Sequence, residues 1–486
     1  MKTRNRQTKK AHSSGGVSLR QKDVFVLSFG AMLGWSWVVL SGDWILSAGV
    51  FGTLLALLLG GIFVLFVGIV YAELTAAMPE SGGILLFGKR AFGRNTAFLG
   101  TWFVTLGFLS VICFESVALP NVIAYLFPQY PSGFLYSISG FDIYASWLAV
   151  GMASSLLIMI LNYRGAKTAT AVQTLLTLLI VIIGLAFFIA TIASGNLETC
   201  TFQLRNGING TLSVLVMMPF VLCGFDVIPH MAGETSMPAK RIGQMLILSV
   251  VAAVIWYMMI SLCVGSALDE SEIAGSLLPT ADAMGRVFGG SKFASNLLVA
   301  GGIAGILACW NAFYMGASRS IYTLAQEGFL PAAFAKIHPK HETPGNAILL
   351  VGALSTIAPL FGKNMLTWMV NAGSFGTVIA YLVTALCFLR LRKREPDLPR
   401  PYAVRKWRLV GGLAVTMCIG MLFLYMPGCP SALLWPYEWA IVLLWVMLGA
   451  LLLGAKKLEA MKLHAIVKRR QNALFAQNDE NKMGEC

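Results

Sequence analysis

The sequence predicts an all-α polytopic membrane protein with twelve transmembrane helices, arranged as a 5+5 inverted repeat with discontinuous first and sixth helices and two extra C-terminal helices. Composition is the first observation behind this prediction. Of the 486 residues, 57% are hydrophobic and only 12% are charged, which is too apolar for a soluble domain of this size. The other two observations are a series of long apolar runs and a helix-breaking pattern in two of them.

The apolar runs have the length of membrane spans. A helix needs about 20 apolar residues to cross the roughly 30 Å hydrocarbon layer. Runs of this order that carry few or no charges recur along the chain, and the ninth is the shortest. The predicted spans cover residues 24–50, 52–76, 97–126, 143–161, 168–193, 211–235, 243–267, 293–325, 346–361, 366–389, 409–426 and 435–454. An even number of spans places both termini on one side.

The basic residues of the loops are strongly asymmetric. Of the 36 Lys and Arg residues, only Arg205, Arg286, Lys292 and Lys363 fall in loops opposite the N-terminus. Because cytoplasmic loops concentrate Lys and Arg, both termini are expected in the cytoplasm and the protein in the inner or plasma membrane. The net charge of +14 is explained by this topology and by contact with anionic membrane lipids, so no nucleic-acid partner is expected.

Glycine and proline interrupt the first and sixth spans. In the first, Gly30 and Gly34 lie in an apolar run, where each glycine costs a helix about 1 kcal/mol. In the sixth, Pro219, Gly224 and Pro229 are evenly spaced, and each proline removes a helical hydrogen bond. Either span alone is explained equally well by packing of small residues. As a pair, Gly34 and Gly224 lie 190 residues apart in the first helices of two five-helix blocks, which is typical of an inverted-repeat transporter.

This interpretation divides the chain into five segments. Residues 1–22 are expected to form a basic cytoplasmic tail, and residues 23–193 the first repeat with spans one to five. Residues 211–390 form the second repeat with spans six to ten, in the opposite orientation because five is odd. Residues 391–455 hold a basic cytoplasmic loop and spans eleven and twelve, and residues 456–486 form a cytoplasmic tail.

Several stretches resemble permeases of the amino acid/polyamine/organocation superfamily over roughly residues 20–390. They are Tyr-Ala-Glu-Leu at 71–74 with Pro-Glu-Ser-Gly-Gly at 79–83, Phe220 with Gly-Phe-Asp at 224–226, and Gly-Ala-Ser-Arg at 316–319 with Ala-Gln-Glu-Gly-Phe-Leu-Pro at 325–331. The resemblance implies the LeuT-type fold, in which two broken helices surround the substrate. It also implies secondary transport of amino acids or related amines.

The two breaks form the predicted substrate site. Backbone N–H groups at the start of the second half of span one would bind a substrate carboxylate, because a helix N-terminus attracts anions. Free carbonyls of span six would accept from the substrate ammonium, and Phe220 corresponds to the gating aromatic of the family. One departure is Ser36, which stands where the family usually has a second glycine. The predicted substrate-binding residues are Gly34, Trp35, Ser36, Trp37, Phe220, Cys223, Gly224, Phe225 and Asp226.

Acidic residues inside the spans are the candidates for coupling. Glu115 lies well inside span three, where a charged carboxylate costs roughly 2.5 kcal/mol or more. A proton, a substrate amine or a local network that keeps it permanently protonated would compensate. Asp226 is expected either to hold a cation or to cap the second half of span six by accepting from the Ile228 N–H. Asp43 is expected in the outer vestibule, and Glu73 is expected to be structural.

No cofactor, metal site or catalytic residue is predicted, so the chain is not expected to be an enzyme. The coupling ion is expected to be H⁺ or none. Na⁺ is less favoured, since the sodium-linked relatives use hydroxyl residues in span eight where Cys309-Trp310-Asn311 stands. Thr177 stands where some proton-linked relatives have a lysine. His230 is expected to be a hydrogen-bonded packing residue or a proton relay.

The predicted function is secondary transport of amino acids or related amines by alternating access, as proton-coupled symport or exchange. Two alternatives share every motif above. One is an amine or polyamine permease that lacks carboxylate recognition, and the other is an amine sensor that moves nothing. The identity of the cargo, the oligomeric state and a disulfide between Cys200 and Cys429 remain open at this stage.

Overall fold

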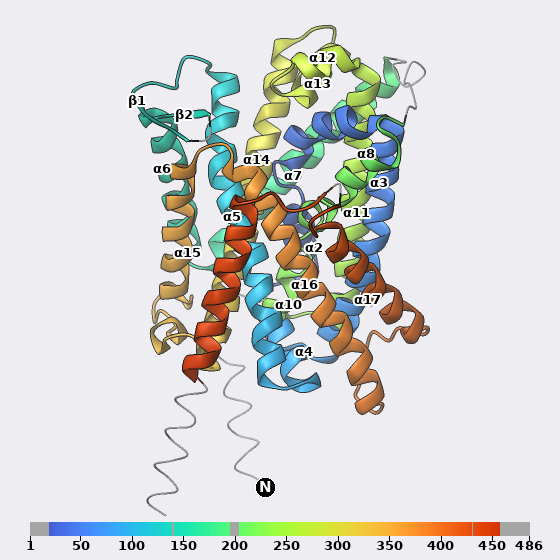
Figure 1. Ribbon diagram of the computed structural model, residues 1–486, viewed down its shortest axis with the longest axis vertical. Helices are drawn as coiled ribbons and strands as arrows, with labels where there is room; N and C mark the ends of the chain where they lie inside the picture. The colour runs from blue at the N-terminus through green and yellow to red at the C-terminus, as the bar shows by residue number, and fades with distance from the viewer. Residues whose placement is uncertain (1–18, 139, 195–203, 430, 457–486) are drawn as a thin grey trace, which may run out of the picture.

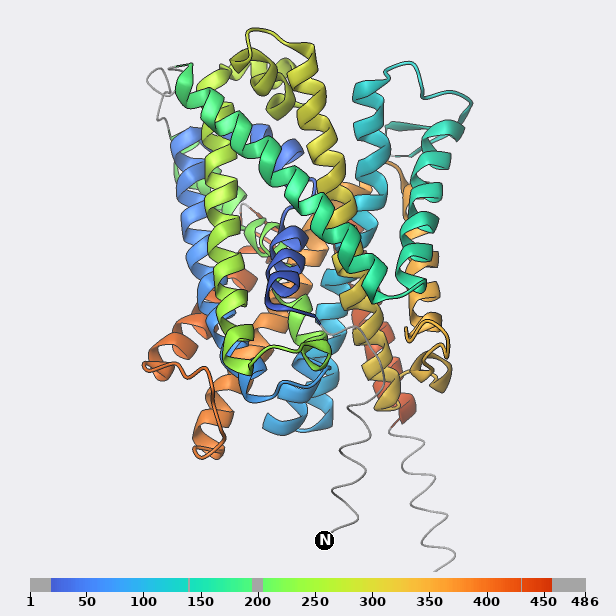
Figure 2. The same cartoon turned by 180° about the vertical axis from the view of Figure 1, so that it is seen from behind.

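The computed structural model describes residues 19–456 apart from 139, 195–203 and 430 (Figures 1 and 2). Most of the chain is helical, and the long helices run roughly along the longest axis of the molecule. The elements are α2 Gln21–Met32, α3 Ser36–Ala77, α4 Ile84–Ala91, α5 Arg94–Leu126, β1 Phe134–Ile138, β2 Phe141–Tyr144, α6 Ala145–Tyr163, α7 Ala166–Ala193, α8 Gly207–Leu215, α9 Met218–Val221, α10 Val227–His230, η2 Ala232–Glu234, α11 Ala239–Ala267, α12 Glu270–Gly275, α13 Pro279–Val287, α14 Lys292–Gln326, η3 Ala332–Ala335, α15 Gly345–Ile357, η4 Ala358–Phe361, α16 Met365–Arg394 and α17 Trp407–Leu424. A further helix spans Tyr437–Lys456.

The chain is a polytopic helical membrane protein. Nine helices of the described segments are long and apolar enough to cross a membrane. Predicted spans one and two share α3, which bends at Gly49 where φ is 72°. Predicted span six is divided among short helices, and predicted span nine is the short α15 with η4. The total of twelve spans and the inverted repeat therefore stay predictions.

One element contradicts the all-α prediction. Strands β1 and β2 pair as an antiparallel hairpin between α5 and α6, at the end that also carries α12 and α13 (Figure 1). The hairpin is short, and only the end of β2 falls within a predicted span, so a scan for membrane spans does not detect it. Gly140, with φ of 79°, permits the tight connection between the strands.

The centre and the periphery of the bundle differ in burial. In α5, 94% of the apolar window is buried against other elements, whereas in the Tyr437–Lys456 helix the share is 17%. Helix α5 packs on α14 and α16, and α3 packs on α11. The last two predicted spans, α17 and Tyr437–Lys456, are among the least buried, as expected for additions to a core. The helix breaks lie inside this core.

Both predicted breaks are present. The first covers residues 33–35, between α2 and α3, and the second covers residues 222–226, between α9 and α10. The first break starts one residue before the predicted Gly34, and Ser36 and Trp37 are already helical. The second matches the predicted segment at Cys223 to Asp226. Glycine weakens the helix locally, and neighbouring groups then hold the freed backbone polar groups.

Oppositely charged pairs occupy the two ends of the bundle. At one end, Arg205 pairs with Glu270, and Arg286 pairs with Glu272, so two of the four predicted outward basic residues lie beside α12. At the other end, Arg392 and Arg400 both pair with the buried Glu73. Glu73 also accepts from the Val404 N–H at 2.7 Å and thereby ties α3 to the segment after α16. The prediction that Glu73 is structural is confirmed.

Candidate functional site

In the core, the second helix break touches the end of α2, directly before the first break. Gly224 has a φ of 133°, and a Cβ added there would lie 3.0 Å from both the Ala31 carbonyl carbon and the Met32 nitrogen. Only glycine adopts this φ without strain, and only glycine lets the second break approach the backbone of α2 so closely. The sequence therefore specifies this contact at one residue.

A small cavity of about 10 Å³ lies at this junction. It is lined by Ala31, Met32, Gly34, Ser36, Val111, Phe114, Glu115, Phe220, Val221, Cys309 and Phe313. Four of the predicted residues, Gly34, Ser36, Phe220 and Glu115, are thus brought together. The volume suffices for about one water molecule, so the walls must separate before an organic cargo can enter.

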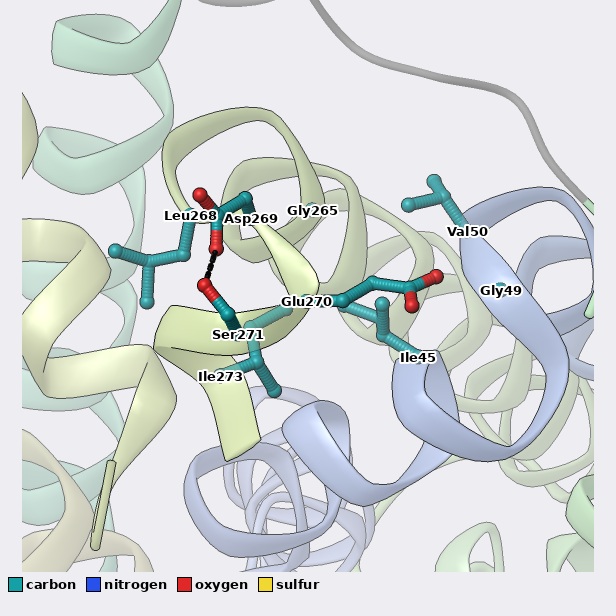
Figure 3. Close-up of a pocket in the computed structure, with 9 residues that line it drawn as sticks. All are labelled: Ile45, Gly49, Val50, Gly265, Leu268, Asp269, Glu270, Ser271 and Ile273. Carbon is teal, nitrogen blue, oxygen red and sulfur yellow. Dashed lines mark hydrogen bonds between the residues drawn. The ribbon is translucent and has the colours of Figure 1, made fainter. Parts of the chain in front are cut away.

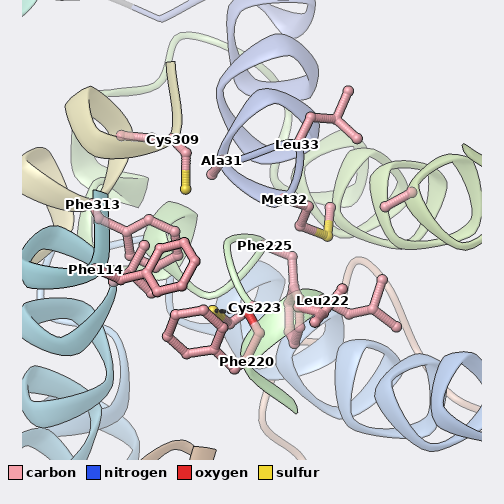
Figure 4. Close-up of a cluster of buried hydrophobic side chains, with 14 of the residues drawn as sticks. Ala31, Met32, Leu33, Phe114, Phe220, Leu222, Cys223, Phe225, Cys309 and Phe313 are labelled. Carbon is pink, nitrogen blue, oxygen red and sulfur yellow. Dashed lines mark hydrogen bonds between the residues drawn. The ribbon is translucent and has the colours of Figure 1, made fainter. Parts of the chain in front are cut away.

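Aromatic rings close one wall of the cavity. Phe114, Phe220 and Phe313 gather from α5, α9 and α14 (Figure 4). The ring centroids of Phe114 and Phe220 are 5.4 Å apart at an interplanar angle of 68°, a favourable edge-to-face arrangement. Phe220 is 6% exposed, as expected of an aromatic that covers a site. Phe114 and Phe313 were not predicted, because an apolar span does not reveal which of its faces points inward.

Tyr257 of α11 bridges the first break. Its hydroxyl donates to the Met32 carbonyl at 2.7 Å, and the Ser36 hydroxyl lies 2.9 Å from the Tyr257 oxygen. Because the single Tyr257 proton goes to Met32, Ser36 is the donor in the second bond. The serine that departs from the family pattern therefore helps to connect the end of α2 with the start of α3. The sequence signal that could have pointed to Tyr257 is its polar hydroxyl inside an otherwise apolar span.

Glu115 of α5 faces the first break directly. It is 1% exposed, and the Trp35 N–H and the Cys309 thiol are both placed to donate to its carboxyl group. A Cβ on Gly34 would collide with Glu115 Oε1, so the carboxyl lies on the glycine itself. Glu115 Oε2 has no hydrogen-bond partner among the described residues. None of the ion pairs of the described segments includes Glu115.

Asp226 holds the second break in a way that sequence reasoning did not foresee. Its Oδ1 accepts from the Gly224 N–H at 2.9 Å, two residues back. The predicted cap on the Ile228 N–H is wrong, because that N–H bonds to the Phe225 carbonyl at 3.3 Å. Asp226 Oδ2 has no hydrogen-bond partner in the described part of the chain, although the Tyr381 side chain lies beside the carboxyl group.

The remaining predicted residues lie around the cavity rather than on its wall. Phe225 packs edge-on against Tyr71 with centroids 5.6 Å apart, and the Trp37 ring packs on Trp256 at 5.7 Å. Trp35 is 1% exposed and its ring packs against Gly302.

The predicted carbonyl acceptors are engaged in the backbone of the second break. The Phe220 carbonyl accepts from the Cys223 thiol at 2.8 Å, and the Gly224 carbonyl accepts from the Val227 N–H at 3.2 Å. A cargo ammonium would have to share these oxygens with their local donors, because each carbonyl accepts with two lone pairs.

Three other residues have clear positions. His230 is fully buried, with its ring 5.5 Å from that of Phe108, but neither nitrogen has a hydrogen-bond partner among the described residues. It packs as predicted, yet the predicted hydrogen bond is wrong. Asp43 is exposed, in agreement with its predicted vestibule position. Thr177 contacts the first broken helix at Gly30. Cys200 lies outside the described residues, so its pairing with Cys429 stays untested.

A larger hollow of about 370 Å³ lies beside the bend of α3 at Gly49, lined by Ile45, Gly49 and residues of α12 (Figure 3). Its acids already have partners. Asp269 accepts from the Ser271 hydroxyl at 2.8 Å and from the Glu272 N–H, and it caps α12. These bonds hold the pKa of Asp269 below its usual value. With Glu270 paired to Arg205, this hollow offers no unpaired acid comparable to Glu115.

Comparison with known proteins gives a consistent result over most of the chain. A family model described as amino acid permease matches residues 19–450. The chain is 24% identical over 426 residues to the branched-chain amino acid permease BcaP of Bacillus subtilis, covering 84% of this chain and 89% of that protein. It is 25% identical to the aspartate-proton symporter of the same organism, with 81% and 76% covered, and 23% identical to its methylthioribose transporter, with 88% and 91% covered.

Proposed function

Because this chain belongs to the amino acid permease family, whose model matches residues 19–450, we propose that it moves amino acids or related amines across the cell membrane as a secondary active transporter. Permeases are carriers rather than enzymes. The observation that carries the proposal is the cavity between the two helix breaks, where the buried Glu115 lacks a partner for one oxygen. An acidic residue buried in a membrane core without an ionic partner among the described residues is by default a candidate for function.

Alternating access is the proposed mechanism. The cavity of about 10 Å³ is too small for any amino acid, so the described conformation corresponds to a collapsed site. Interrupted helices permit the two halves of each span to move separately, because no continuous ladder of hydrogen bonds joins them. Phe220 and Phe114, on different elements, would part as the site opens.

The relatives do not fix the cargo. Their names refer to branched-chain amino acids, aspartate and methylthioribose, which differ in charge and in the presence of a carboxylate. We therefore propose the broad class of amino acids or related amines as cargo, with membrane lipids as further expected partners.

Counterflow tests this proposal. Purified protein in liposomes preloaded with a mixed pool of amino acids and amines is expected to accumulate radiolabelled tracer transiently. An amine sensor of the same fold would bind the tracer without counterflow. Absence of counterflow for every member of the pool, in protein that binds at least one member, would favour the sensor.

We further propose that Glu115 carries the coupling proton in symport or exchange. Glu115→Gln keeps the volume and one acceptor oxygen while removing titration. At saturating cargo, the variant should lose accumulation driven by a pH gradient by at least ~10-fold while passive exchange falls by less than ~3-fold. Uphill accumulation equal to that of the parent, with the same pH profile, would show that Glu115 has only a structural role.

We infer the orientation from the asymmetry of Lys and Arg, which places both termini in the cytoplasm. Labelling of Cys486 by an impermeant thiol reagent should require permeabilised cells. Labelling from outside intact cells would contradict the inferred orientation.

A further inference from the structure

The carboxylate subsite of the first broken helix is already filled by the protein itself. The start of α3 presents its N–H groups to the core, and such a helix terminus attracts a negative group. The Glu115 carboxyl lies against Gly34 and takes the Trp35 N–H. It thus occupies the place that the carboxylate of a zwitterionic cargo would take.

A second carboxylate at this position is unfavourable. The Trp35 N–H can serve only one of two carboxyl groups well, and the ionised form of Glu115 would in addition repel the carboxylate of a cargo in this water-poor core. No Lys or Arg side chain of the described residues forms an ion pair there to offset the repulsion. The site therefore discriminates against a cargo that brings its own carboxylate.

The rest of the cavity suits an ammonium group on an apolar body. Glu115 Oε2 is buried and has no hydrogen-bond partner among the described residues, so an acceptor is available. The rings of Phe114, Phe220 and Phe313 line the same cavity (Figure 4). Aromatic faces attract cations and pack well on aliphatic or aromatic groups. The Ser36 hydroxyl is already committed to Tyr257.

We infer that Glu115 serves as a built-in substitute for the cargo carboxylate, and that the preferred cargo is an organic amine cation with an apolar body and no carboxylate. This inference rests on the proposed transport function and narrows its substrate class. The ammonium would donate to Glu115 Oε2 while Oε1 stays on the first break. Asp226 does not compete for the amine, since it is not among the residues that line the cavity.

Matched pairs that differ only by the carboxylate provide the test. Leucine with 3-methylbutylamine, and phenylalanine with 2-phenylethylamine, would be titrated against the purified full chain while thermal unfolding is followed. Each amine should reach half-maximal stabilisation at a concentration at least ~10-fold lower than its amino acid. In the Glu115→Gln variant the preference should shrink to within ~3-fold, because the repelling charge and the ammonium partner are both gone.

Glu438→Gln is the matched control. Glu438 is also fully buried, but its oxygens accept from Asn371 and from the Leu434 N–H, and it does not line the cavity. Its neutralisation should leave the amine preference unchanged.

Stabilisation of the parent by the amino acids at equal or lower concentrations than the amines would overturn the inference and leave the transport proposal intact. An unchanged amine preference in Glu115→Gln would overturn the role of Glu115. Should that variant fail to fold, the comparison within the parent protein still decides the cargo class. If no compound of either class stabilises the parent, the inference fails, and counterflow then decides the proposed function separately.

Discussion

A carboxyl group accepts from a backbone N–H in each of the two helix breaks, but the two carboxyl groups differ in how far along the chain they lie from the break. At the second break, Asp226 accepts from the Gly224 N–H only two residues away. At the first break, Glu115 reaches the Trp35 N–H from α5, a helix some eighty positions later in the sequence. A break that satisfies itself keeps its geometry when neighbouring helices move. A break that depends on a remote carboxyl loses that partner when α5 moves or when a cargo or proton engages the carboxyl. The first break is therefore expected to respond to cargo, and the second to act as a fixed support.

Gly224, where the second break touches the end of α2, is the position with the largest expected effect. A leucine there would be strained by the φ of 133°, at about 1–3 kcal/mol. It would also press on the backbone of Ala31 and Met32, and overpacking of this kind adds about 1–3 kcal/mol. Gly224→Leu should abolish cargo uptake in proteoliposomes while membrane insertion and yield stay close to those of the parent.

Gly420→Leu in α17 is the control for that substitution. An added Cβ at Gly420 meets nothing within 4 Å, so a leucine there faces no obstacle. Near-normal uptake by Gly224→Leu would mean that transport does not need the close contact at Gly224. The two breaks could then not be treated as parts of one site.

The sequence allowed the second break to be predicted better than the first, for a physical reason. Pro219, Gly224 and Asp226 are neighbours in the chain, so their effects on one helix can be read locally, even though the bond partner of Asp226 was misassigned. At the first break, Gly34 marked the place, but the partners Tyr257 and Cys309 come from other helices. Contacts between helices depend on rotation about each axis, which an almost uniformly apolar span does not specify.

The same reasoning explains the successes and failures elsewhere in the fold. Glu73 could be assigned a structural role because it stands near the predicted cytoplasmic end of span two, and the structure pairs it with Arg392 and Arg400. The β1–β2 hairpin could not be detected, since its strands are short and contribute no long apolar run of their own. Phe225 was expected at the cargo but faces Tyr71, because adjacent residues in a break point in different directions.

Removal of the Tyr257 hydroxyl should have an intermediate effect confined to the first break. In Tyr257→Phe, the Met32 carbonyl and the Ser36 hydroxyl both lose a buried partner, at about 1–3 kcal/mol. Cargo affinity should fall by ~10-fold, measured by the concentration that gives half-maximal uptake. The comparison variant is Tyr425→Phe, which removes a hydroxyl that donates to the Val216 carbonyl at 2.6 Å, in the connection between α8 and α9 that precedes the second break. Equal losses of affinity in both variants would mean that the first break has no special sensitivity.

Asp226→Asn should have the smallest effect, and it tests whether the second break is only a support. The amide oxygen of asparagine has the size and position to keep accepting from the Gly224 N–H, so the local bond survives with a neutral acceptor. A charge-assisted bond is stronger than a neutral one, yet the buried carboxylate also carries a desolvation cost that asparagine avoids, and the two changes oppose each other. Uptake should therefore stay within ~3-fold of the parent, with an unchanged dependence on pH and on Na⁺.

Asp226 Oδ2 lacks a hydrogen-bond partner in the described part of the chain, which is also what a cation ligand would show. A loss of ion dependence in Asp226→Asn, with folding intact, would assign the cation to Asp226 and make the second break an active part of coupling.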